Sequence, residues 1–322
     1  MKLLHVKKFS FFVLRFSISF LLIYFLLRKI DFHKLSSKIS DINYSFLFLA
    51  FICQLSVIFI ATYRWQTLLS GRDIKIEFKK LLNFNFIGLF FNSFLPGASS
   101  GDFVKMYKVV NHCEDKIYAG ISVLAERIIG IYSISVLVLA ACIFSFKMLP
   151  RELIFAILSM IFVIYYALFL FISLKSWITG LMDKSQGSEK ALDKIKQYII
   201  IFYEAMHFFI THRKVLLKVL FYSLLMQILS IISCYFVARA AGLDLSVFYF
   251  FIFVPIVFLA TVIPISLSGI GVREGIFVYL FNKVNVPSEE AIFISLLYFS
   301  VGMMFSLAGG VVHFISNIKK AD

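Results

Sequence analysis

Charged residues are scarce in this chain, and their scarcity excludes most classes of soluble protein. Only 16% of the 322 residues are Asp, Glu, Lys or Arg, while 61% are hydrophobic and 18% are aromatic. A soluble domain has about 25% charged residues and about 45–50% apolar ones. One core cannot bury such an apolar excess. Soluble enzymes, disordered scaffolds, coiled coils and disulfide-stapled secreted domains are therefore excluded, and a polytopic membrane protein remains.

Acidic residues are outnumbered by basic ones, 18 to 32, which gives a formal net charge of +14. The basic residues gather at the ends of apolar runs, a pattern typical of the cytoplasmic loops of membrane proteins. We therefore expect membrane lipids as partners and no nucleic acid.

Cysteine is also rare, with four in the chain, and no two form a Cys-x-x-Cys motif. The six histidines are scattered, and nucleotide-binding and hydrolase motifs are missing. We expect no metal, no cofactor and no catalytic residue, so that a role other than enzyme is favoured.

Seven apolar runs reach the roughly twenty residues that a helix needs to cross about 30 Å of hydrocarbon. We predict an all-α polytopic bundle of seven or eight transmembrane helices, with two interrupted or re-entrant segments that form a pseudo-repeat. The seven runs are Phe9–Leu27, Tyr44–Tyr63, Ala119–Phe146, Leu153–Leu174, Val215–Ala241, Val247–Leu267 and Ala291–Ile315.

The longest polar stretch, residues 175–214, separates two halves of similar plan, about 1–174 and 215–322. Apolar residues in its second part recur at helical spacing, which predicts either a helix on the membrane surface or an amphipathic connector packed on the bundle. We expect one integral membrane domain in the plasma (inner) membrane. Charge places the N-terminus and this connector in the cytoplasm, and it leaves the side of the C-terminus open.

Proline is rare as well, and two of the five prolines stand at matching places. The segments 81–110 and 263–281 share the pattern Pro-x-x-x-Ser-Gly, followed by an acidic residue and a new apolar stretch. We interpret this as a weak internal duplication with one helix break in each copy. The breaks are expected at Pro96 and Gly97 and at Pro264 and Gly271.

Such breaks favour a polar cavity. Irregular backbone at membrane depth is tolerated only where protein or water surrounds it. A helix that restarts after a break also offers unpaired N–H groups to an anion. Paired interruptions in two halves are typical of a transport site near the bilayer midplane. Ordinary loops between helices are the alternative, and the match between the two copies favours the cavity.

Several charges lie within or beside these spans, where a charge costs about 2.5–3.5 kcal/mol. We expect Glu126 to pair with Arg273, and Arg127 to pair with Glu274 or Asp102. The pairs either fix helix positions or orient the arginines toward an anionic headgroup, and their place beside the breaks favours the headgroup. Four cations nearer to helix ends are expected to extend toward the membrane surface: Arg15, Arg64, Lys218 and Arg239.

Four blocks resemble the signature blocks of the lysylphosphatidylglycerol synthase transmembrane region, a family of flippase-like integral membrane proteins of bacteria and archaea. The blocks are residues 63–69, 90–109, 122–132 and 263–281. The resemblance implies a relative of the translocase half of aminoacyl-phosphatidylglycerol synthases, which moves a modified phospholipid across the bilayer. Lys105 stands where the family has a basic residue after its Gly-Asp. Since residue 322 closely follows the last apolar run, we expect a stand-alone membrane domain without the synthase domain.

The leading hypothesis is a translocase for an anionic phospholipid or a polyprenyl-phosphate-linked lipid. The alternatives are a membrane-embedded accessory protein or enzyme of lipid or glycolipid synthesis, with lipid-modifying enzymes or glycosyltransferases as partners, and a structural membrane subunit. Residues expected to bind the headgroup are Ser99, Ser100, Gly101, Lys105, Arg127, Ser268, Gly269 and Arg273. Residues expected to hold these cations or a coupling ion are Asp102, Glu126 and Glu274.

Overall fold

The computed structural model describes residues 41–95, 100–144, 150–163, 165–166, 212–262 and 269–321, with side chains as far as residue 316. Regular structure in these ranges is helical throughout, which confirms the predicted all-α class. The expected span 9–27, the end of the span 153–174 and nearly all of the connector 175–214 lie outside the described residues. Residues 151–163 are helical.

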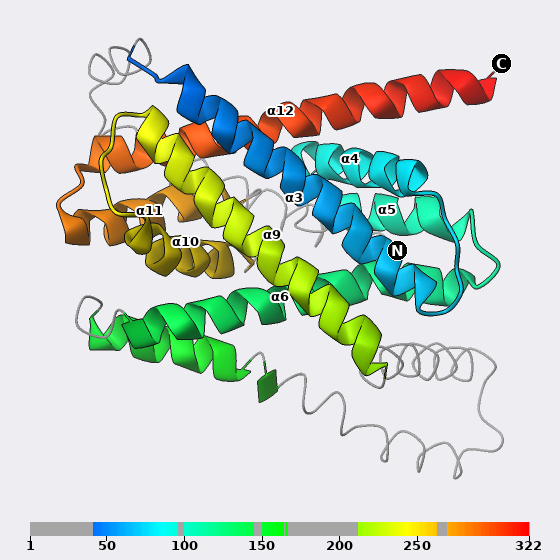
Figure 1. Ribbon diagram of the computed structural model, residues 1–322, viewed down its shortest axis with the longest axis horizontal. Helices are drawn as coiled ribbons and strands as arrows, with labels where there is room; N and C mark the ends of the chain where they lie inside the picture. The colour runs from blue at the N-terminus through cyan, green and yellow to red at the C-terminus, as the bar shows by residue number, and fades with distance from the viewer. Residues whose placement is uncertain are drawn as a thin grey trace, which may run out of the picture.

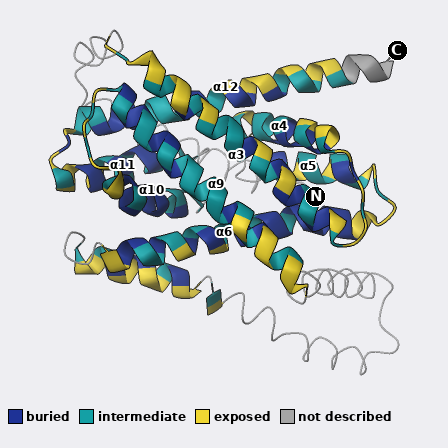
Figure 2. Ribbon diagram, viewed as in Figure 1, coloured by how far each residue is buried: buried dark blue, intermediate teal, exposed yellow. Residues whose placement is uncertain are grey.

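Four described helices are long and apolar enough to cross a membrane. They are α3 (Tyr44–Ser70), α6 (Lys116–Phe144), α9 (Arg213–Ala240) and α12 (Ser288–Ala321). Helices α3 and α12 each contain a whole predicted apolar run, and α6 and α9 each contain all but the last residues of one. Large apolar side chains of these helices are exposed, among them Phe48, Phe221 and Met304. Figure 2 shows exposed residues in yellow along the long helices. Such faces suit contact with lipid.

The two interrupted segments form two helical hairpins. The first joins α4 (Phe78–Phe94) to α5 (Ser100–Val110), and the ring of Phe84 near the start of α4 lies 5.3 Å from that of His112 just after α5. The second joins α10 (Val247–Val262) to α11 (Val272–Phe281), where Phe250 and Phe281 are also 5.3 Å apart. Each second arm therefore runs back along the first.

The second arms are too short to cross a membrane. At 1.5 Å per residue, α5 and α11 are about 16 Å long, against about 30 Å of hydrocarbon. The expected full span at 247–267 is therefore one arm of a hairpin, since α10 ends at Val262 and the chain returns through α11. After α11, a 3-10 turn at Asn282–Val284 leads into α12.

The order and packing of the helices repeat. In the first half α3, α4, α5 and α6 have 27, 17, 11 and 29 residues, and in the second half α9, α10, α11 and α12 have 28, 16, 10 and 34. Each helix packs on the next in both series. In addition, α4 packs on α12 and α10 packs on α6. The first arm of each hairpin thus contacts the last helix of the other half.

The two halves are inverted relative to each other. The corresponding helices α3 and α9 lie side by side (Figure 1), and the amide of Asn43 before α3 donates to the carbonyl of Ala240 at the end of α9, at 2.9 Å. They therefore run antiparallel. Figure 1 also shows the two hairpins at opposite ends of the molecule, with their break ends turned toward its middle. Inverted repeats with broken helices are a plan of membrane transporters.

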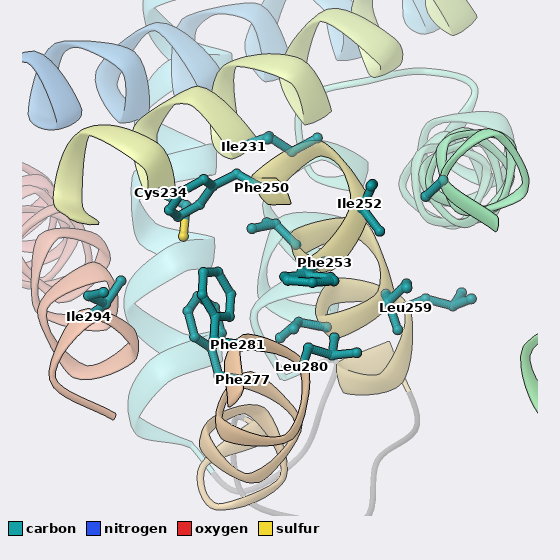
Figure 3. Close-up of a cluster of buried hydrophobic side chains, with 14 of the residues drawn as sticks. Ile231, Cys234, Phe250, Ile252, Phe253, Leu259, Phe277, Leu280, Phe281 and Ile294 are labelled. Carbon is teal, nitrogen blue, oxygen red and sulfur yellow. The ribbon is translucent and has the colours of Figure 1, made fainter. Parts of the chain in front are cut away.

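A hydrophobic cluster holds the second hairpin in place. Figure 3 shows Phe250 and Phe253 of α10 against Phe277 and Phe281 of α11. The rings of Phe277 and Phe281 are stacked at 4.6 Å, and offset or edge-on aromatic pairs add about 0.5–1.5 kcal/mol to the energy of burial. This packing holds the second half of α11 against α10, and the first turn of α11 carries the charged residues of the second break.

Candidate functional site

A cavity of about 370 Å³, lined by both polar and apolar side chains, lies between the two halves. The residues that line it come from α3, α4, α6, α10, α11, α12 and the stretch before α11: Gln54, Leu89, Asn92, Ser93, Arg127, Thr261, Gly269, Arg273, Tyr298, Phe299, Gly302, Met303 and Ser306. Gln54 and Arg127 lie near the middle of α3 and α6. The cavity is therefore at mid-depth in the bundle, where both hairpin breaks contribute to its wall.

Arg273 brings a buried cation to this cavity from the second break. It is 9% exposed, its Nε donates to Glu274 Oε1 at 2.9 Å, and its Nη2 forms an ion pair with the same carboxylate. The guanidinium also lies over the ring of Phe299, 4.6 Å from its centroid. In the described part of the chain, the polar contacts of this group use Nε and Nη2. Since a guanidinium has five N–H donors, others remain for a ligand.

Arg127 brings a second cation to the same cavity from α6. Its Nη1 donates to Asp102 Oδ2 at 2.9 Å. Asp102 was one of the two partners predicted for Arg127. Its side chain is 35% exposed, against 11% for that of Arg273. One cavity therefore contains an arginine from each half, and each arginine is oriented by its own carboxylate.

Glu126 points to a different part of the bundle. The predicted partner of Glu126 and the predicted surface position of Arg64 are both wrong. Its carboxylate pairs with Lys105 at 2.8 Å and with Arg64 at 3.2 Å, and not with Arg273. Arg64 does not extend to the membrane surface. It is buried and its Nη1 donates to Ser223 of α9 at 3.0 Å. Helix crossing explains both errors, because α3 and α5 approach α6 on the face that carries Glu126.

Lys105 is held away from the cavity. Its ammonium lies 4.4 Å from the centroid of the Trp65 ring, and the indole of Trp65 donates to Ser122 at 2.9 Å. A cation over an aromatic face in a desolvated site is stabilised by about 2 kcal/mol. This group of side chains joins α3, α5 and α6, and we interpret it as structural.

The first residues of the helices that follow the breaks are already hydrogen-bonded within the chain. The Ser100 hydroxyl donates to the carbonyl of Phe91 at 2.8 Å, and the Gly101 amide donates to Asn92 Oδ1 at 2.8 Å. At the second break, the Gly271 amide donates to Glu274 Oε2 at 2.6 Å. Acidic side chains in both first turns, Asp102 and Glu274, face the positive end of each helix dipole. The arginines are therefore better placed than the helix termini to attract an anion.

The predicted break residue Gly271 directly precedes α11, and the other predicted site residues divide into three groups. Arg127, Arg273 and Gly269 line the cavity. Ser100, Gly101 and Lys105 contact other helices, as do Asp102, Glu126 and Glu274, which hold cations. Predicted residues that lie outside the described ranges are Ser99, Ser268, Pro96, Gly97 and Pro264. Within the described ranges, no three His, Cys, Asp or Glu side chains are placed to hold a metal ion.

Sequence reasoning missed the uncharged half of the cavity wall. Gln54 Nε2 donates to the Tyr298 hydroxyl at 2.7 Å, and the hydroxyls of Ser93 and Ser306 are 2.8 Å apart. Lone polar residues within apolar helices are their only signal in the sequence. Such residues face the interior of a bundle more often than lipid, because lipid offers them no partner.

Fold and site together define an integral membrane protein whose inverted halves enclose a polar cavity. The chain belongs to a known family of membrane proteins, since the family model described as lysylphosphatidylglycerol synthase TM region matches residues 12–310.

Similar proteins of this kind are known in archaea. A UPF0104 membrane protein of Pyrococcus horikoshii is 24% identical over 291 residues, covering 83% of this chain and 86% of the relative. Another UPF0104 membrane protein, from Methanocaldococcus jannaschii, is 26% identical over 296 residues, with 87% of each chain covered. These relatives match the chain along most of their own length.

Proposed function

We propose that this protein is a lipid translocase, in which the cavity accepts the anionic headgroup of a lipid while the hydrocarbon chains stay in the bilayer. One observation carries the proposal: Arg127 and Arg273 come from different halves and line the same cavity at mid-depth. Arginine suits phosphate because its planar guanidinium can donate two parallel hydrogen bonds to it. In a site of low dielectric, such bonds are stronger than in water.

The inverted repeat supports movement rather than mere binding. Two halves of opposite orientation can rock about a central site and expose it to each side of a membrane in turn. Both hairpins contribute to the cavity wall, through Asn92 and Ser93 of α4, Thr261 of α10 and Arg273 of α11. A shift of either hairpin would therefore change access to the site. A lipid is the ligand that reaches a site at this depth without leaving the membrane.

Two pair-neutralising variants test the proposal without leaving a buried charge alone. In the first, Arg273→Gln is combined with Glu274→Gln, which removes both charges of the cavity pair. The matched control combines Arg239→Gln with Asp244→Asn, a pair outside the cavity at the end of α9. Each protein is reconstituted in vesicles that contain fluorescent phosphatidylglycerol, and quenching from outside measures the lipid that changes leaflet.

The wild type and the control are expected to move lipid and to leave its headgroup mass unchanged, whereas the cavity variant should be at the level of protein-free vesicles. Equal rates for all three folded proteins, or no movement by the wild type, would overturn the proposal and favour a structural role for the ion pairs. A changed headgroup mass would favour the enzyme alternative.

A further inference from the structure

The charged residues that the structure places on the cavity wall are arginines, and their carboxylate partners lie behind them. Of the residues that line it, two are arginines and none is Asp or Glu in the described part of the chain. The sequences of the two breaks, 96–99 and 263–268, also lack acidic residues. The nearest carboxylates, Asp102 and Glu274, are bound to the arginines themselves. A cationic headgroup would therefore meet the two guanidinium groups of the wall, while the nearest carboxylates are already paired with those groups.

The rest of the polar wall is neutral and rich in hydroxyl and amide groups. It consists of Gln54, Asn92, Ser93, Thr261, Tyr298 and Ser306. Four of these side chains are bonded in two pairs, Gln54 with Tyr298 and Ser93 with Ser306. Since each hydroxyl has one donor and two acceptor sites, these pairs retain capacity for a ligand. Neutral groups of this kind match the hydroxyls of glycerol or a sugar.

From the arginines and the neutral polar residues of the wall we infer the class of headgroup. It is a phosphodiester with an uncharged, hydroxyl-bearing head, such as glycerol or a sugar, and not an aminoacylated head. The inference rests on the proposed function, because it concerns the same cavity. The arginines bind the phosphate, the neutral wall binds the hydroxyls, and like charge excludes the free amine of an aminoacyl group. Like charges brought together in a binding site cost several kcal/mol.

Asn92 offers a way to reverse this selectivity. Its Oδ1 accepts the amide of Gly101 at 2.8 Å, and the residue lines the cavity. The substitution Asn92→Asp keeps an oxygen for that amide and adds the missing carboxylate at nearly the same volume. Ser70→Asp, at the exposed end of α3, adds the same charge far from the cavity and serves as the control.

The experiment measures binding of short-chain lipids to the purified full-length protein in neutral detergent. Phosphatidylglycerol is compared with lysyl-phosphatidylglycerol, which adds a cationic head, and with phosphatidylmethanol, which keeps the phosphodiester but lacks hydroxyls. Lysyl-phosphatidylglycerol should bind about tenfold or more weakly because of like charge. Phosphatidylmethanol should bind about threefold to tenfold more weakly through lost neutral hydrogen bonds. Asn92→Asp should bring the two glycerol lipids to similar affinity, and Ser70→Asp should change neither.

The outcomes separate this inference from the proposed function. If lysyl-phosphatidylglycerol binds the wild type as tightly as phosphatidylglycerol, and both depend on Arg273, the headgroup class is wrong while the anion site stands. If phosphatidylmethanol binds as tightly as phosphatidylglycerol, the neutral residues do not bind the hydroxyls and the inference also fails. If no lipid binds in an Arg273-dependent way, both the inference and the proposed function fail.

Discussion

At the scale of single residues, Glu126 is a buried carboxylate that pairs with two cations. It is 4% exposed and its two oxygens contact Lys105 and Arg64. The side chains of these two cations are only 12% and 11% exposed, so little water can replace the carboxylate. Glu126 therefore joins α3, α5 and α6 through one group.

We predict that Glu126→Gln lowers stability strongly. The change leaves two buried cations without a carboxylate, and removal of one partner of a buried pair costs about 3–5 kcal/mol. Thermal unfolding in detergent measures the effect as a lower midpoint. The exposed Glu152 supplies the control substitution Glu152→Gln, which should unfold like the wild type.

Addition of Lys105→Met to Glu126→Gln should recover part of the loss, because one uncompensated charge is removed. A single Glu126→Gln variant as stable as the control would contradict the structural role of this group.

Sequence patterns identified the charged residues but only some of their partners. For Arg127 the sequence left Glu274 and Asp102 open as partners, and the structure shows the pair with Asp102. Arg64 was misplaced because distance along α3 does not show which face of the helix meets α6 and α9. The partner of a charge inside a membrane is decided by helix crossing, which a single sequence does not specify.

At the scale of helices, α4 is held between two glycine contacts. A methyl group added at Gly101 of α5 would lie 1.9 Å from the carbonyl oxygen of Gly88, and one added at Gly309 of α12 would lie 1.9 Å from that of Phe86. The backbones therefore approach as closely as glycine allows, which is common where membrane helices pack.

We predict that Gly309→Ala destabilises the protein, because α12 must move away from α4. Overpacking of this kind costs about 1–3 kcal/mol. Gly275→Ala in α11 is the control, since a methyl group there meets no atom within 4 Å. Alanine should stabilise that helix by about 0.5–1 kcal/mol. Unfolding midpoints that shift in the same direction for both variants would contradict the predicted close packing.

The helix breaks could be predicted, since proline with glycine and serine stops a helix for local reasons. The return of α11 along α10 could not be, because the run 247–267 is apolar and long enough to cross a membrane alone. The direction of the chain after the second break is set by the aromatic cluster between α10 and α11, and this cluster forms only in the folded protein.

At the scale of the whole molecule, the two ends of the bundle differ in charge. Basic residues dominate the end where α3 and α5 finish and α4, α6 and α9 begin: Arg72, Lys75, Lys79, Lys80, Lys108, Lys116, Arg213, Lys214 and Lys218, with the acids Asp73, Glu77, Glu114 and Asp115. At the opposite end acids prevail: Asp41, Glu152, Asp244, Glu289 and Glu290, with the cations Arg151, Arg239 and Lys283. Figure 1 places the end of α12 on the basic side.

We predict from this asymmetry that the basic end and the end of α12 face the cytoplasm. A membrane-impermeant maleimide should label Lys283→Cys in intact cells and Lys116→Cys only after permeabilisation. The native Cys113 gives little background, because burial raises the pKa of its thiol and the thiolate is the reactive form. The opposite labelling pattern would invert the proposed orientation.

The duplication was predictable from the matching prolines, whereas the sequence left open whether the two copies are inverted. Apolar runs look alike whichever way they cross a membrane, so hydropathy carries no direction. The antiparallel contact of Asn43 with Ala240 supplies that information.

Translocation by single and double arginine variants tests the central claim most directly. If Arg127 and Arg273 act on one headgroup, Arg127→Gln and Arg273→Gln should each reduce lipid movement in vesicles to near the protein-free rate. The double variant should then be no slower than either single variant, because the shared step is already lost. Independent effects that multiply in the double variant, or movement that persists in it, would contradict a shared site between the two halves.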